Sequence, residues 1–123
     1  MKIKGVRKDK KHYGDIVELS SEEKAKAIVQ EGIAQEEEEK GYRSFLKDLN
    51  IKELVQASNG SKLKKLYENN LYKASGTATL VRRRMETNAL LEPKSVKFKI
   101  EFHDVLTHNG VPDLKITKLE YTV

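Results

Sequence analysis

The chain of 123 residues contains no cysteine and no tryptophan, and it has only two prolines. Without cysteine it cannot form disulfides, thiolate zinc sites, cysteine-ligated iron–sulfur clusters or a cysteine nucleophile. Aromatic residues are also sparse, with three phenylalanines and five tyrosines, so the core of the fold must be mostly aliphatic. No stretch approaches the roughly 18 consecutive apolar residues of a membrane-spanning helix.

Motifs that carry catalysis are absent as well. The sequence has no Gly-x-Ser-x-Gly nucleophile elbow, no Gly-x-x-x-x-Gly-Lys phosphate loop and no glycine-rich dinucleotide fingerprint. The three histidines, His12, His103 and His108, lack the close spacing of a metal site. A site made from His103, Asp104 and His108 would need the chain to fold them together, and no further ligand is evident. We therefore expect a non-enzymatic protein without cofactor or metal.

Charged residues make up 35% of the chain, and their layout is uneven although the formal net charge is +5. Residues 1–19 carry six basic and three acidic side chains, residues 20–40 carry three and seven, and residues 41–123 carry fifteen and nine. The acidic segment at 20–40 repels phosphate, so the chain suits a nucleic-acid partner less than its net charge of +5 suggests. The charged N-terminus lacks the apolar segment of a secretory signal, so we expect a cytoplasmic protein with no membrane partner.

The first 38 residues are predicted to form a small strand–helix module. Residues 2–6 and 16–19 alternate like short strands. Ser20 is a good N-cap because a glutamate three residues later completes a capping box. We expect Gly32 to end the helix that follows, and residues 33–35 could return as a third short strand. A unit of this size without disulfides rarely folds alone, so it should dock on the rest of the chain or on another protein.

This stretch also carries a resemblance. The residues concerned are Gly14-Asp15-Ile16-Val17-Glu18-Leu19-Ser20, then Glu22-Glu23 and a short helix into Glu31-Gly32-Ile33-Ala34. In this pattern the chain resembles the small N-terminal module of many bacteriophage and prophage proteins, including the YqbF-like family. Such proteins are often encoded near capsid and head–tail connector genes. The resemblance implies a phage or prophage origin, a role in virion assembly or at the head or neck, and a location in the host cytoplasm or on the virion.

Four consecutive glutamates at 36–39 mark the expected end of this module, and a second domain follows over 41–123. The glutamates fit a solvated linker or the first turn of a new helix, and an acidic docking strip for a basic partner is the alternative. From 41 to about 69 the apolar spacing predicts helices. The first helical face combines residues at i, i+3, i+4 and i+7, which are Tyr42, Phe45, Leu46 and Leu49.

The remainder of the chain predicts a three-stranded antiparallel sheet, with strands at about 71–82, 95–106 and 113–123. The middle strand gives the clearest signal because apolar and polar residues alternate along it. Asn109-Gly110 predicts a two-residue turn into the last strand. The apolar phase changes part-way along that strand, which predicts a bulge near Thr117-Lys118 or burial of both faces. The alternating apolar residues of the middle strand are Val96, Phe98, Ile100 and Phe102.

The last strand is a candidate protein-binding edge. Pro112 removes one backbone donor near its start, as on an edge strand. Apolar residues then continue to the final position of a highly charged chain, which is typical of a surface that another protein covers. The candidate edge consists of Leu119, Tyr121 and Val123.

Nucleic acid is the alternative partner. Arg82, Arg83 and Arg84 could contact phosphates together with a lysine-rich helix at 62–69. At most two of these arginines share a surface if they lie in a strand, because consecutive strand residues point to opposite faces. A solvated strand end that discourages edge-to-edge aggregation is a further interpretation. The lysines of the predicted helix are Lys62, Lys64 and Lys65.

The sequence therefore predicts an α+β protein with an N-terminal strand–helix module, a helical middle and a C-terminal three-stranded antiparallel sheet. We expect it to be a non-enzymatic interaction or structural protein. Its expected partner is another protein, either a phage head or connector protein or a second copy of the chain. The alternative function is that of a nucleic-acid-binding accessory protein.

Overall fold

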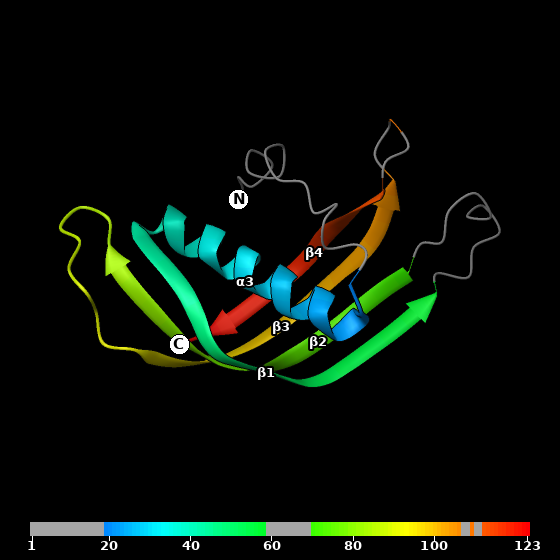
Figure 1. The fold of residues 1–123 in the computed structure, drawn as a ribbon, viewed down its shortest axis with the longest axis horizontal. Coiled ribbons are helices and arrows are strands. Elements are labelled where there is room, and N and C mark those ends of the chain that lie inside the picture. Colours follow the sequence, from blue (N-terminus) through cyan, green and yellow to red (C-terminus); the bar gives the residue numbers. More distant parts are fainter. Residues whose placement is uncertain (1–18, 59–69, 107–108, 110–111) are drawn as a thin grey trace.

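The structure is a computed structural model that describes residues 19–58, 70–106, 109 and 112–123. One helix and four strands occupy these residues, and the strands form a single antiparallel sheet in the order β1-β2-β3-β4. The sheet curves around the helix, which lies across its concave face (Figure 1). The fold is thus α+β. The elements are α3 (Ser21–Glu39), β1 (Tyr42–Ser58), β2 (Asn70–Arg84), β3 (Lys94–Leu106) and β4 (Pro112–Thr122).

The predicted fold class was wrong in two respects. Residues 42–58 form strand β1 and not helices, so the helical middle does not exist as predicted, and the sheet has four strands instead of three. The part of the predicted middle at 59–69 lies outside the described residues. The other three strands were placed within about two residues of their observed bounds.

Two bulges in β1 explain why a strand looked like a helix. The register against β2 shifts between Lys47 and Asn50 and again between Ile51 and Glu53, so one extra residue enters the strand at each place. Inward-facing residues are then spaced by three, two and three positions instead of by two. Spacings of three also occur on a helix face, and the predicted helical face combined the inward Leu46 and Leu49 with Phe45, which points to the opposite side of the strand. The inward residues of β1 that pack against the core are Leu46, Leu49, Ile51 and Leu54.

Helix α3 begins as predicted and continues further than predicted. The Ser20 side chain accepts a hydrogen bond from the Glu23 backbone N–H at 3.3 Å, which confirms the N-cap. Gly32 lies inside the helix, so the strand expected at 33–35 and the linker expected at 36–39 are both helical. A side chain at Gly32 would meet Leu119 of β4, with 3.0 Å between the added Cβ and Leu119 Cδ2. Gly32 therefore permits close helix–strand packing and does not end the helix.

The core lies between α3 and the concave face of the sheet. Ile28 and Ile33 of the helix, Leu80 of β2 and Phe102 of β3 have no exposed surface. Residues 21–38 thus share one core with the sheet. The buried apolar set is completed by Ala25, Val29, Leu46, Tyr72, Ala74, Ala78, Val96, Phe98, Ile100 and Leu114.

Strand β4 contains the bulge that its apolar pattern predicted. Glu101 of β3 pairs with Lys118, whereas the next residue, Phe102, pairs with Ile116, so Thr117 is the extra residue. Its hydroxyl donates a hydrogen bond to the Glu101 carbonyl at 3.2 Å. The bulge lets Ile116 and Leu119 both face the core. The two-residue turn predicted at Asn109-Gly110 lies partly outside the described residues, since Gly110 is one of those left out.

Candidate functional site

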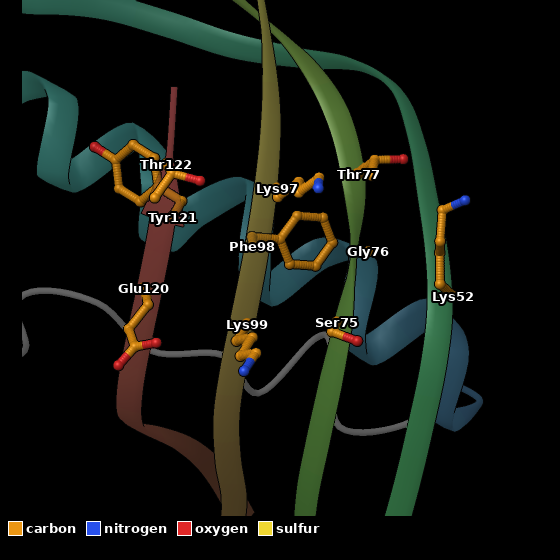
Figure 2. A pocket seen from close by; sticks show the side chains of 10 residues that line it. All are labelled: Lys52, Ser75, Gly76, Thr77, Lys97, Phe98, Lys99, Glu120, Tyr121 and Thr122. Atoms are coloured by element: carbon orange, nitrogen blue, oxygen red, sulfur yellow. The ribbon is translucent and has the colours of Figure 1, made fainter.

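The outer face of the sheet, opposite α3, carries a shallow hollow of about 570 Å³. Figure 2 shows it at the middle of the sheet, beside Gly76 of strand β2. No helix or strand of the described residues covers this face (Figure 1). The hollow is lined by Lys52, Ser75, Gly76, Thr77, Lys97, Phe98, Lys99, Glu120, Tyr121 and Thr122.

Basic and hydroxyl side chains surround this hollow. Lys97 pairs with Thr77 on one side and Thr122 on the other, and Lys99 pairs with Ser75. Their side chains stand on the outer face because Val96, Phe98 and Ile100 alternate with them and are buried against the helix. Ammonium and hydroxyl groups are the side chains that commonly contact phosphate oxygens.

The charge of the outer face is opposite to that of the helix layer. Helix α3 has seven glutamates and two lysines. By strand alternation, pairing and the lining of the outer hollows, the outer face carries the exposed basic residues Arg43, Lys47, Lys52, Lys73, Arg83, Lys97, Lys99, Lys115 and Lys118, against the acidic residues Asp48, Glu53, Glu101, Asp113 and Glu120. The molecule is therefore acidic on its helical side and basic on the other side of the sheet.

The predicted arginine cluster is divided between the two faces. Arg82 points toward the helix, with its Nη1 3.4 Å from Glu37 Oε1, and only 15% of its side chain is exposed. Arg83 is exposed, and its Nη1 donates to the Asn88 carbonyl at 3.0 Å. Arg84 shares the side of Arg82, since both guanidinium groups lie over the Tyr42 ring, at 4.7 Å for Arg82 and 5.7 Å for Arg84. The three side chains do not form one phosphate-binding surface.

Glu37 is the centre of a buried polar network. Its carboxylate is fully buried, and it accepts hydrogen bonds from Arg82 at 3.4 Å and from the Tyr121 hydroxyl at 2.5 Å. Lys40 adds an ion pair at 3.6 Å. Burial raises the pKa of Tyr121, and the hydrogen bond to Glu37 raises it further. The network stabilises the end of the helix against β2 and β4.

A second buried network lies near the start of the helix. The Lys24 ammonium is 3.2 Å from the Tyr72 hydroxyl and 3.5 Å from Asp104 Oδ1, and the Tyr72 hydroxyl donates to Asp104 Oδ2 at 3.2 Å. All three residues are buried, and the Tyr72 ring stacks on Phe102 with 4.8 Å between centroids. A lysine, a tyrosine and an aspartate in contact can perform acid–base chemistry, but all three are buried in the helix–sheet core and none of them lines the two hollows of the outer face. We interpret this network as structural.

Sequence patterns had not identified Lys24. They had considered Asp104 only for a metal site with His103 and His108, and Glu37 only as part of the linker or acidic strip at 36–39. For Glu37 a signal existed, because Ala25, Val29, Ile33 and Glu37 follow one another at intervals of four. The apolar stripe of the helix therefore continues across Gly32 and ends on a carboxylate. An interpretation of Gly32 as the end of the helix concealed this continuity.

The predicted protein-binding edge lies where the sheet ends. Strand β4 is an edge strand of the four-stranded sheet. Leu119 and Tyr121 point toward the helix, since Leu119 lies next to Gly32 and Tyr121 contacts Glu37. Val123 is 58% exposed. The outward side chains of the same segment are Lys118 and Glu120, whose Nζ and Oε2 atoms are 3.6 Å apart.

Of the histidines, only His103 falls among the described residues. It is half-buried on β3, and desolvation lowers its pKa, with Lys115 lowering it further and Asp104 opposing the shift. In the described part of the chain no group of three or more His, Asp or Glu residues could hold a metal ion. His12, His108, Lys62, Lys64 and Lys65 lie outside the described residues.

Comparisons with protein-family models, with curated proteins and with solved structures each find no match to this chain. Among the helices of the described residues, none has the length and apolar character needed to cross a membrane.

Proposed function

We propose that this chain is a non-enzymatic accessory protein that binds another protein chain by extending its sheet at β4. The observation that carries the proposal is the position of β4 at the edge of the sheet, where no other strand of the described residues pairs with its outer side. An edge strand presents a row of unpaired backbone donors and acceptors, which is a template for an added strand.

Strand β4 suits this role better than β1, which forms the opposite edge. Two register shifts interrupt β1, and bulges are a common means of preventing edge pairing. Beyond the bulge at Thr117, β4 pairs regularly with β3 from Lys118 to Thr122. A partner strand can follow this regular segment.

The partner that best fits the charges of β4 is a second copy of the same strand. Lys118 and Glu120 point outward on either side of Leu119. In an antiparallel pair centred on Leu119, Lys118 of each copy lies opposite Glu120 of the other. Opposite charges in direct cross-strand pairs contribute roughly 0.2–1 kcal/mol each, and the two-fold symmetry makes two such pairs.

Sedimentation velocity over a range of concentrations tests this proposal. We expect a dimer whose dissociation constant rises about 2- to 30-fold in Lys118→Glu, because both pairs then become glutamate–glutamate pairs. The charge-swapped variant Lys118→Glu/Glu120→Lys should restore dimerisation. Lys97→Gln is the matched control, since it removes a lysine from the neighbouring strand and not from the edge. A chain that stays monomeric, or a charge swap that restores nothing, would contradict the proposal.

The phage origin remains a prediction from the resemblance of the first 38 residues, of which residues 1–18 lie outside the described part. A role in virion assembly, and a location in the host cytoplasm or on the virion, have the same basis. The corresponding partners are head or connector proteins. Capture of such a protein by the wild-type chain, and its loss when β4 pairing is blocked, would support this assignment.

A further inference from the structure

A strip of basic residues crosses the outer face of the sheet, and the proposed pairing at β4 does not use it. Lys97 and Lys99 of β3 border the hollow at one end (Figure 2). Lys47 of β1 follows, two pairs along the strand from Phe45. Arg43 and Arg83, which are cross-strand partners, form the other end. We call these five basic residues together with Phe45 the basic strip.

We propose that the basic strip binds the phosphate backbone of single-stranded nucleic acid without sequence preference. Lysine and arginine would neutralise phosphates, and the hydroxyls beside Lys97 and Lys99 would donate hydrogen bonds to phosphate oxygens. From the row of Lys99 and Ser75 to the row of Arg43 and Arg83 the strip covers nine residues of β2, about 27 Å from the first to the last. This length accommodates several nucleotides.

The cross-strand pair of arginines is the most specific feature of the strip. Arg43 and Arg83 stand opposite each other on adjacent strands, and both are exposed. Like charges directly opposite are destabilising in a sheet. An anion between them removes this repulsion, so the pair favours a bound phosphate.

Phe45 supplies the aromatic surface that single-stranded binding needs. It is 51% exposed, although an apolar side chain of this size gains by burial. Its neighbour Leu46 is buried against the helix, so Phe45 faces outward on the basic side of the sheet. Bases stack on such side chains whatever their identity.

The shape of the sheet favours a single strand over a duplex. The sheet curves around α3, so its outer face is convex (Figure 1). A duplex is stiff, with a persistence length of about 50 nm, and it contacts a convex surface over a short length only. A flexible single strand can follow the curvature.

Acidic side chains near the basic strip reduce its positive charge but do not neutralise it. Glu120 lines the hollow, and Asp48 lines a neighbouring hollow that reaches Thr79 and Lys97. The charge of Glu120 is compensated by Lys118 at 3.6 Å. The five basic residues of the strip therefore outnumber the acidic groups near it.

Fluorescence anisotropy with a labelled 20-nucleotide oligothymidine tests the proposal. We expect binding at 50 mM NaCl that weakens steeply with salt, with a log–log slope of about −3 for roughly four phosphate contacts. Lys97→Gln/Lys99→Gln removes two of these contacts, so it should make the slope shallower, at about −1.4, and weaken binding about tenfold or more. Phe45→Ala should weaken binding about tenfold without changing the slope.

Lys26→Gln on the exposed side of α3 is the matched control and should bind like the wild type. Circular dichroism of each variant shows that it is folded. The Lys118→Glu variant should keep oligothymidine binding, which separates this inference from the proposed pairing at β4. Absence of binding at 50 mM NaCl, wild-type binding by the strip variants, or stronger binding of a duplex of the same length would overturn the proposal.

Discussion

Tyr121 of β4 donates a hydrogen bond to the fully buried carboxylate of Glu37, with 2.5 Å between the two oxygens. This contact joins the last turn of the helix to the final strand of the sheet, 84 residues later in the chain. The other carboxylate oxygen interacts with Arg82 of β2. A buried charge is tolerated only when its partners are present, so the network determines where the end of α3 lies on the sheet.

Arg82 and Arg83 should differ in their effect on stability, although they are adjacent and chemically identical. Arg82→Ala leaves Glu37 buried with weaker compensation, and we expect it to lower the free energy of unfolding by about 3 kcal/mol. Arg83→Ala removes an exposed side chain and should change it by less than about 0.5 kcal/mol. Urea denaturation measures both. Equal effects of the two substitutions would show that the Glu37 network does not contribute as described.

Removing one member of the Lys24–Tyr72–Asp104 network should lower the free energy of unfolding strongly, whereas replacing all three with apolar residues should change it little. Asp104→Ala leaves the Lys24 ammonium buried without its carboxylate, so we expect a loss of about 3 kcal/mol. The triple variant Lys24→Met/Tyr72→Phe/Asp104→Leu removes every polar group of the set. Its free energy of unfolding should lie within about 1–2 kcal/mol of the wild-type value. Thermal and urea unfolding of both variants would reveal strong non-additivity. A triple variant less stable than Asp104→Ala would contradict this expectation.

Gly76→Ala should be among the most damaging single changes in the sheet. A Cβ at this position would lie 2.0 Å from the Asn50 carbonyl oxygen, which belongs to the backbone of β1 and cannot rotate away. We expect β1 to shift and the free energy of unfolding to fall by about 3 kcal/mol.

Gly32→Ala is the matched comparison for that change. The added Cβ meets only side-chain ends, Leu119 Cδ2 at 3.0 Å and Ile116 Cδ1 at 3.3 Å, and alanine favours the helix by about 1 kcal/mol over glycine. The two effects oppose each other, so stability should stay within about 1 kcal/mol of the wild type. Urea denaturation that ranks Gly32→Ala as the more damaging variant would contradict the described packing of β1 over Gly76.

Protonation of His103 should lower the free energy of unfolding at acidic pH. Its pKa in the folded chain is below the ordinary value of 6.5, because of desolvation and then Lys115. The unfolded chain therefore binds a proton at a higher pH than the folded one, and stability is lost as the pH falls below about 6.5. His103→Gln should remove this part of the pH dependence, and Lys115→Gln should reduce it. Urea unfolding between pH 5 and pH 8 measures both. Identical pH profiles for His103→Gln and the wild type would show that His103 does not titrate in this way.

Local sequence patterns were sufficient to place an element where the spacing of its apolar residues stays constant along its length. Strand β3 alternates without interruption and was recognised at its observed position, and Ser20 was recognised as an N-cap from its own hydrogen-bonding chemistry. The bulge at Thr117 was predicted because it leaves a change of phase in a strand that is otherwise regular. In each case the signal is contained within a few neighbouring residues.

The sequence alone thus determined strands β2, β3 and β4, the start of the helix and the lack of recognised catalytic motifs. Tertiary structure decided the rest. Residues 42–58 form a strand because two bulges let their irregularly spaced apolar residues face the core beside β2. A search for a constant strand period in the sequence does not detect such a strand. Gly32 stayed inside the helix because β4 packs against it, and Arg82 turned inward because Glu37 lies across from it. These outcomes depend on residues tens of positions apart, whose contacts exist only after the sheet has closed over the helix.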